Sequence, residues 1–264
     1  MGDGARMRLA VQEATSLGWW TGDRVGADQL TLWLTLHLSS VGDDAQSLSR
    51  LTWAVRRLTA PPPRTTQLSP GSVDWMRAEL GISATITDFM RGAEAAEALQ
   101  GMEGLHRITL ACLLFHVWRL SGDDAPRQIE AAVLGLRMMG GPAGFLPLTL
   151  AGLGAVTVTG SAERRLSAWI AGTHQATLAA LLHLDRLRRW QDRATVETAD
   201  LSGRTPQTLI TALARLPMLS APVAEAETGA SRASVQRNLA LLEHRGLIRE
   251  ITGQGRFRVW TAKV

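Results

Sequence analysis

The sequence predicts a mainly α-helical protein that ends in a small β-hairpin. Through residues 1–200, apolar residues recur three and four positions apart, as Leu113, Val117 and Leu120 do, and this spacing is typical of helices with one buried face. Two short β-prone runs, separated by a glycine-rich turn, lie near the C-terminus. We therefore expect a multi-helix N-terminal body followed by a smaller C-terminal domain that contains a hairpin.

The apolar spacing places a series of helices along the N-terminal body, and glycines mark where several of them end. Gly81, Gly101 and Gly122 each follow such a segment, and Gly140-Gly141-Pro142 forms a stronger stop. The expected helices span residues 5–17, 27–39, 44–58, 73–80, 85–99, 105–120 and 126–139.

A longer helical pattern covers residues 162–196, and we expect it to be broken or bent near Gly172. Near its end, Leu184, Leu187 and Trp190 share one face, and arginines 186, 189 and 193 lie on or near another. Two interpretations of this basic face stand. It extends a nucleic-acid contact, or it is a solvated surface with Asp185 and Asp192 as partners, and the solvated surface is the commoner case.

The composition of the chain and a proline-rich run predict the domain organisation. With 45% hydrophobic residues, the chain is expected to fold. The run Pro61-Pro62-Pro63 and its polar flank are typical of a linker. We expect four segments: an N-terminal helical segment (1–60), a proline-rich linker (61–69), a helical body (70–200) and a C-terminal domain (201–264).

Location is predicted from what the sequence lacks. There is no apolar run of about 18 residues, so no membrane-spanning helix or membrane partner is expected. The N-terminus lacks the basic and then apolar residues of a secretory signal peptide, so secretion is not expected. Cys112 is the single cysteine, which excludes an internal disulfide and fits a reducing compartment. We expect a cytoplasmic protein.

The C-terminal domain has the sequence plan of a winged helix-turn-helix. Thr205 is expected to cap a helix that begins at Pro206, Ser220 caps a short helix whose inward residues are Val223 and Ala226, and Gly229 supplies a turn. Ser231 then caps a second helix with Val235, Leu239 and Leu242 inward, and Gly246 ends it. The β-prone runs 247–251 and 257–260 flank the turn 252–256, which predicts a hairpin wing. Such a domain places its second helix in the major groove of DNA.

Eight residues are candidate DNA contacts. Ser234, Gln236 and Arg237 point outward near the start of the second helix, and Gln and Arg side chains can read adenine and guanine edges. Ser231 and Arg232 are placed for phosphates. The wing residues are expected to face the backbone or the minor groove; they are Gln254, Arg256 and Arg258.

The distribution of charge supports a polyanionic partner. The isoelectric point of about 10.7 overstates the basicity, because the net charge is +4 and the chain has no tyrosine and only one lysine, Lys263. Residues 201–264 hold nine arginine and lysine residues against four glutamates, a balance of +5, and residues 1–200 balance at −1. The positive excess therefore lies in the domain expected to meet DNA.

Residues 223–260 resemble the C-terminal winged helix appended to many Fic-domain proteins. They are still more similar to that of an uncharacterised, often plasmid-borne helix-turn-helix family of alphaproteobacteria. The shared ending runs GLIREITGQGRFRVW, residues 246–260. The resemblance covers about 60 residues and implies a DNA-binding regulator; residues before about 160 carry only a vague similarity.

No enzyme site is expected. Fic transferases need an H-x-F-x-(D/E)-G-N-G-R loop, and the nearest candidate, around His116 and Gly122-Asp123-Asp124, lacks the Gly-Asn-Gly nest. A helix stop followed by an N-cap explains that segment better. Cys112 and His116 stand four residues apart on one helix, a spacing that suits a metal, but a buried thiol beside a core histidine is favoured. His174 and His183 lack acidic partners at matching spacing, so we expect no metal or cofactor.

These observations favour a transcriptional regulator that binds double-stranded DNA. A homodimer is expected, because one recognition helix reads too few base pairs. Two alternatives stay open: an adaptor whose winged helix docks a protein partner, with the helical body as a second partner surface, and a degenerate Fic-like pseudoenzyme.

Overall fold

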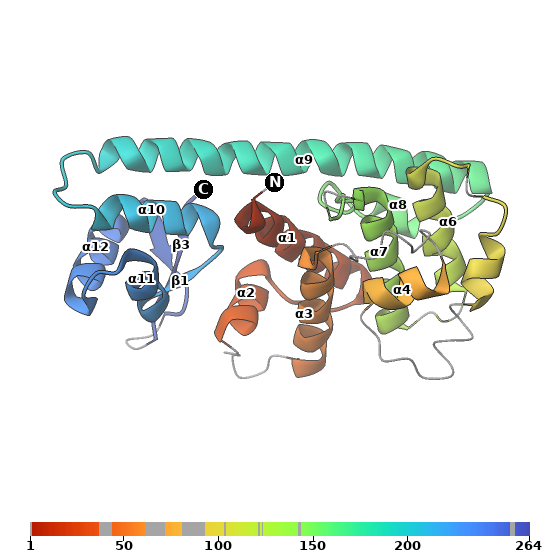
Figure 1. The fold of residues 1–264 in the computed structure, drawn as a ribbon, viewed down its shortest axis with the longest axis horizontal. Coiled ribbons are helices and arrows are strands. Elements are labelled where there is room, and N and C mark those ends of the chain that lie inside the picture. The colour runs from red at the N-terminus through yellow and green to blue at the C-terminus, as the bar shows by residue number, and fades with distance from the viewer. Residues whose placement is uncertain are drawn as a thin grey trace. The chain divides into compact units, whose positions relative to one another are not determined.

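The computed structural model describes residues 2–36, 44–61, 72–80, 93–102, 104–120, 122, 124–141, 144–253 and 257–264. The chain divides into two compact units (Figure 1). We call Leu9–Ala180 the helical unit, and Met1–Arg8 together with Leu181–Val264 the C-terminal unit. The predicted boundary between residues 200 and 201 falls inside the C-terminal unit. The predicted linker 61–69 lies, except for Pro61, outside the described residues.

The chain is mainly helical, as predicted. None of the helices in the described residues is both long and apolar enough to cross a membrane. The helices that contribute to the helical unit are α1 (Asp3–Thr21), α2 (Ala27–Leu36), α3 (Ala45–Thr59), α4 (Val73–Leu80), α6 (Arg107–Arg119), α7 (Ala125–Gly140), α8 (Gly154–Thr157) and the first part of α9 (Ala162–Glu197).

Side-chain caps fix the starts of several of these helices. The Asp44 carboxylate accepts a hydrogen bond from the Gln46 amide at 2.9 Å before α3, and Asp124 accepts one from the Arg127 amide at 2.9 Å before α7. These bonds satisfy amides that the first helical turn leaves unpaired. The expected helix at 85–99 begins outside the described residues, and its described part is helical at 93–98.

Helix α9 is continuous from Ala162 to Glu197, so the predicted break at Gly172 is wrong. The reason lies in the packing of this glycine. A Cβ atom at Gly172 would lie 2.6 Å from the Cβ of Ala155 and 3.5 Å from Leu148 Cδ1. Glycine at this position therefore allows α9 to pack closely against α8. The low helix propensity of glycine does not end the helix here.

Aromatic side chains fill the core of the helical unit. Trp169 of α9 is fully buried, and its ring centroid lies 5.0 Å from that of Phe115 on α6. The Trp169 indole nitrogen donates to the Met139 sulfur on α7 at 3.3 Å. Helices α6 and α7 make the most extensive contact in this unit, and α9 packs its tryptophan against both. This packing fixes the positions of α6 and the first turns of α9 relative to each other.

The C-terminal unit combines helices with a small antiparallel sheet, seen in blue in Figure 1. The sheet order is β1-β3-β2, and Leu219 pairs with Trp260 while Glu250 pairs with the same residue from the other side. The sequence gives no sign of β1, because a two-residue strand has no periodicity. In chain order the elements after α9 are α10 (Thr205–Arg215), β1 (Leu219–Ser220), α11 (Ala221–Thr228), α12 (Arg232–His244), β2 (Ile248–Glu250) and β3 (Val259–Ala262).

The end of α9 belongs to the core of the C-terminal unit. Leu187 and Trp190 are buried there with apolar residues of α10, α12 and the sheet. The Trp190 indole nitrogen donates to the Leu247 carbonyl at 2.7 Å. This bond connects α9 to the chain just before β2, so residues from 181 onward act as part of the folded C-terminal unit and not as a detached linker.

The first turns of α1 also belong to this unit. The Arg8 guanidinium donates to the carbonyls of Leu213 and, at 2.6 Å, of Leu216 at the end of α10. Burial lowers the pKa of Arg8 to about 10, so the group remains charged at neutral pH. A cation at a helix C-terminus is favourable because the last carbonyls carry partial negative charge. This contact joins residues more than 200 positions apart.

Candidate nucleic-acid interface

The turn between α11 and α12 forms as the sequence predicts. Gly229 ends α11 with a φ of 63°, in the left-handed region that glycine adopts at low cost. Ser231 is the N-cap of α12, and its hydroxyl accepts a hydrogen bond from the Ser234 amide at 3.4 Å. Thr205 is not a cap: α10 begins at this residue, and its N-cap is Arg204 without a side-chain bond.

The inner faces of α11 and α12 differ in how well the sequence predicts them. Val235, Leu239 and Leu242 are fully buried, as expected. In α11 the prediction is wrong, because Val223 is 38% exposed and the buried residues are Ala224 and Thr228. A helix of eight residues has too few turns to define its face from apolar spacing alone.

The outward face of α12 carries the predicted contact residues. Ser231, Arg232, Gln236 and Arg237 are exposed, and Ser234 is half-buried. Arg237 has no carboxylate within 4.0 Å among the described residues. Its guanidinium and the Gln236 amide are therefore available to an external partner. They lie within the first two turns of the helix, where partial positive charge gathers.

Two of the predicted contact residues have acidic neighbours. Arg232 lies 3.7 Å from Glu225 on α11, a long contact between side chains that water reaches. The Arg258 guanidinium donates to Glu243 of α12 at 2.9 Å and stacks over the Trp260 ring at 5.0 Å. Arg258 therefore bridges the residue before β3 to α12, and only part of its guanidinium remains for another partner.

The described part of the turn between β2 and β3 is organised by one carboxylate. Glu250 accepts hydrogen bonds from the Thr252 amide at 2.7 Å and from the Gly253 amide at 3.0 Å, and the Thr252 hydroxyl also donates to it. These bonds fold the chain back after β2. The predicted contacts Gln254 and Arg256 lie outside the described residues.

Two exposed residues beside the wing were missed by the sequence argument. Phe257 is 78% exposed with a φ of 58°, and Arg249 is exposed on β2. Both residues lie in β-prone runs of the sequence, 247–251 and 257–260, where strand positions are expected. Alternation along β2 was the available signal for Arg249, because its neighbour Ile248 is buried. No sequence signal marks the exposure of Phe257.

The basic end of α9 is partly paired with acidic side chains. Arg189 lies 2.8 Å from Asp185 and Arg193 lies 3.7 Å from Glu197. Arg245, just after α12, forms two 2.7 Å hydrogen bonds with the Asp200 carboxylate. These contacts fit the solvated-surface interpretation for Arg189 and Arg193, whereas Arg186 and Arg188 are exposed and have no carboxylate within 4.0 Å among the described residues.

The other chemical candidates have structural explanations. Asp124 is the N-cap of α7, as the interpretation of a helix stop followed by a cap expects. Cys112 is buried on α6, and within the described ranges no group of three metal-ligating side chains forms. His116 and Cys112 instead line a cavity with residues from α9. No protein-family model matches the chain, and the search of curated proteins finds no match.

Proposed function

We propose that residues 205–262 form a winged helix-turn-helix that binds duplex DNA, and that the protein is a transcriptional regulator. The observation that carries this proposal is the face of α12. Gln236 and Arg237 are exposed in its first turns, Arg237 has no acidic partner among the described residues, and the opposite face is fully buried. A helix of this kind can enter the major groove without exposing its core.

The element order supports the same assignment. Three helices followed by a hairpin, with a short strand after the first helix, is the plan of a winged helix, and the sheet order β1-β3-β2 agrees with it. In this arrangement α12 is the recognition helix, and the hairpin of β2 and β3 is the wing.

The charges of the C-terminal unit favour a nucleic acid over a neutral partner. Three of the glutamates after residue 200 are already paired: Glu225 with Arg232, Glu227 with Arg215 and Glu243 with Arg258. The fourth, Glu250, accepts hydrogen bonds from the turn of the wing. Within residues 201–264 the remaining basic residues therefore carry the excess charge, and binding to phosphates would release counterions.

Each contact has an expected role. Gln236 and Arg237 would meet base edges, because their forked groups match adenine and guanine. Ser231 and Arg232 would meet phosphates, since the first turn of α12 presents amides and a cation together. Ser234 would contact either. Gln254, Arg256 and Arg258 would contact the backbone or minor groove from the wing.

The test is binding of a fluorescent duplex of mixed sequence, measured by anisotropy at low salt. We expect Arg237→Ala and Arg256→Ala each to weaken the affinity about tenfold, the loss typical of a charged contact. Arg164→Ala is the matched control: it removes the same charge from an exposed residue of the helical unit and should bind like the wild type.

Equal affinity of the wild type and both C-terminal variants would refute the proposed interface. A purified complex with one stoichiometric protein and no duplex binding at low salt would favour the adaptor function instead. One feature gives that alternative its own support: Leu181 and Leu182 of α9 are each 58% exposed, and exposed neighbouring leucines are typical of protein contacts.

A further inference from the structure

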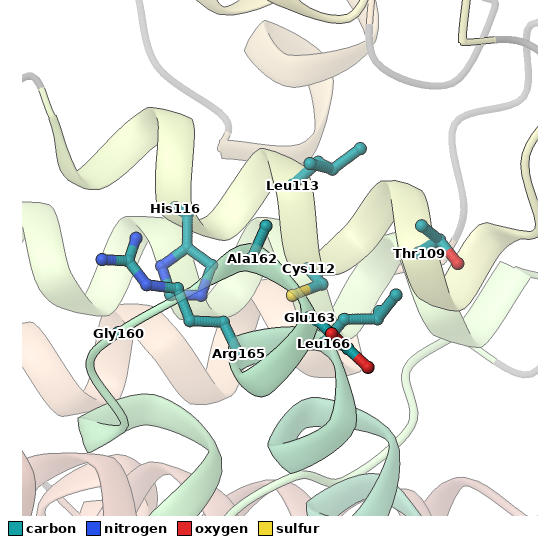
Figure 2. Close-up of a pocket in the computed structure, with 9 residues that line it drawn as sticks. All are labelled: Thr109, Cys112, Leu113, His116, Gly160, Ala162, Glu163, Arg165 and Leu166. Carbon is teal, nitrogen blue, oxygen red and sulfur yellow. The ribbon is translucent and has the colours of Figure 1, made fainter.

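A cavity of about 370 Å³ lies in the helical unit between α6 and the first turns of α9 (Figure 2). Cys112, Leu113 and His116 line it from α6, and Arg165 and Leu166 line it from α9. This volume is within the range of small-molecule sites, which are mostly apolar with a few placed polar groups. The cavity has that composition.

Two polar side chains in the cavity lack partners. Arg165 Nε and His116 Nε2 are each shielded from solvent and make no hydrogen bond. Arg165 also has no carboxylate within 4.0 Å in the described part of the chain. Arg165 Nε is a shielded donor without an acceptor, which costs free energy, and His116 Nε2 is a shielded nitrogen that donates in one tautomer of the neutral ring. A ligand that carries an acceptor would suit both groups.

The charges of Arg165 and His116 indicate which kind of acceptor group the ligand carries. Burial, together with Arg165 and Arg119, lowers the pKa of His116 to about 4, so the imidazole is neutral at pH 7. The pair then offers a cationic guanidinium and a neutral imidazole that can donate a hydrogen bond. A carboxylate fits this set, because a guanidinium binds it through two parallel bonds and the imidazole can donate one more.

The positions of the other lining side chains indicate where the apolar part of a ligand would lie. Figure 2 shows the Arg165 guanidinium and the His116 ring toward one side, with Thr109 and Leu166 on the other. Glu163, whose carboxylate also points to that other side, is exposed to solvent. An anionic group would therefore lie beside Arg165, and an apolar group would contact Leu113 and Leu166.

A covalent role for Cys112 is not favoured. Burial raises the pKa of its thiol to about 11, so the thiolate that acts as a nucleophile is scarce at neutral pH. The thiol instead forms part of the apolar wall. As the single cysteine of the chain, it is also a reporter of the cavity.

We propose that this cavity binds a small amphipathic carboxylic acid, with the carboxylate paired to Arg165 and hydrogen-bonded to His116 and the apolar part against Leu113 and Leu166. The site lies wholly within the helical unit and does not depend on the DNA-binding proposal.

The test is calorimetric titration of the full chain with octanoate and with 4-phenylbutyrate, each compared with the alcohol of the same carbon skeleton. We expect at least one acid to bind and its alcohol to bind about tenfold more weakly, because the alcohol has no charge to pair with Arg165. Arg165→Gln should lower the affinity for the acid about tenfold and leave the alcohol unchanged. Arg164→Gln, one residue earlier, exposed and outside the cavity lining, should match the wild type.

Alkylation of Cys112 by iodoacetamide locates the site without any variant. The acid that binds should slow this reaction in the wild type, and prior alkylation should abolish the calorimetric signal. The proposal is overturned if neither acid binds, if acid and alcohol bind equally, or if binding leaves the alkylation rate unchanged. If circular dichroism shows that Arg165→Gln does not fold, the acid–alcohol comparison and the alkylation rate of the wild type still test the proposal.

Discussion

Glu13 shows at the residue scale how a buried carboxyl group links stability to pH. It is fully buried on α1, and its Oε1 accepts hydrogen bonds from the amides of Leu148 at 3.0 Å and Thr149 at 2.9 Å. Burial raises its pKa from 4.5 to about 7, although these hydrogen bonds act in the opposite direction. The folded state therefore holds a proton on Glu13 that the unfolded state has released between these two values.

We predict that Glu13→Gln changes the pH dependence of stability. Between pH 4.5 and about 7 the folded state binds more protons at Glu13 than the unfolded state, so this group's contribution to the free energy of unfolding falls as pH rises. The difference in stability, variant minus wild type, should thus increase between pH 4.5 and 7, by about 3 kcal/mol at most, and be flat above. Urea unfolding at several pH values measures it. Glu163→Gln, at an exposed position, should give no such trend; a constant offset for Glu13→Gln would contradict the assignment.

Individual site residues were predictable only where a local rule applied. The outward direction of Gln236 and Arg237 follows from helical spacing around the apolar Val235 and Leu239. The pairing of Arg258 with Glu243 does not, because it joins the residue before β3 to a helix 15 residues away in the chain. His116 and Cys112 were noted as neighbours on one helix, but Arg165 comes from another helix, and only the tertiary fold brings it to the cavity.

At the element scale, a buried ion pair connects helices α4 and α7 and contributes to the stability of the helical unit. Arg137 Nε lies 2.5 Å from Glu79 Oε2, and the two side chains are 1% and 4% exposed. Arg137 also donates to the Ala60 carbonyl at 2.7 Å, after α3. Removing one partner would leave the other charge buried and unpaired.

We predict that Glu79→Ala destabilises the helical unit by about 3–5 kcal/mol. Asp74→Ala is the matched control on the same helix, because Asp74 pairs with Arg77 at 3.7 Å in an exposed position, and such pairs contribute about 0–1 kcal/mol. Chemical unfolding followed by circular dichroism compares the two. Equal losses for the two variants would show that the buried pair does not connect these helices as described.

Element boundaries were predicted well where side chains mark them and poorly where packing decides. The caps at Asp124 and Ser231 are expected from the sequence, and α7 and α12 begin directly after them. The continuity of α9 at Gly172 was not predictable, since it depends on the close approach of Ala155. Strand β1 exists because β3 pairs with it, and a two-residue strand has no pattern of its own.

At the scale of the whole molecule, the grouping of the chain was the least predictable feature. The sequence indicates a change of character near residue 200, where the charge balance becomes positive. The folded unit instead begins at Leu181 and includes Met1–Arg8. Contacts such as those of Arg8 with Leu213 and of Trp190 with Leu247 carry no signal in composition or spacing.

The proposed homodimer is also a property of the whole molecule. Leu181 and Leu182, each 58% exposed on α9, form apolar surface that a second copy of the chain would cover in the expected dimer. We predict that the protein is a dimer by light scattering and that Leu181→Glu with Leu182→Glu yields a folded monomer. Leu178, 43% exposed, offers a milder variant on the same helix. A monomeric wild type would contradict this prediction.

The salt dependence of duplex binding tests the central claim most directly. If α12 and the wing bind phosphates and bases through arginine, the logarithm of the association constant should fall steeply and linearly with the logarithm of salt concentration for the wild type. Arg237→Ala should bind more weakly, and Arg256→Ala should also flatten the slope by about 1, as expected for a lost phosphate contact. The account would be contradicted if the wild type had no measurable duplex affinity at low salt. It would also be contradicted if both variants had the same affinity and the same salt dependence as the wild type.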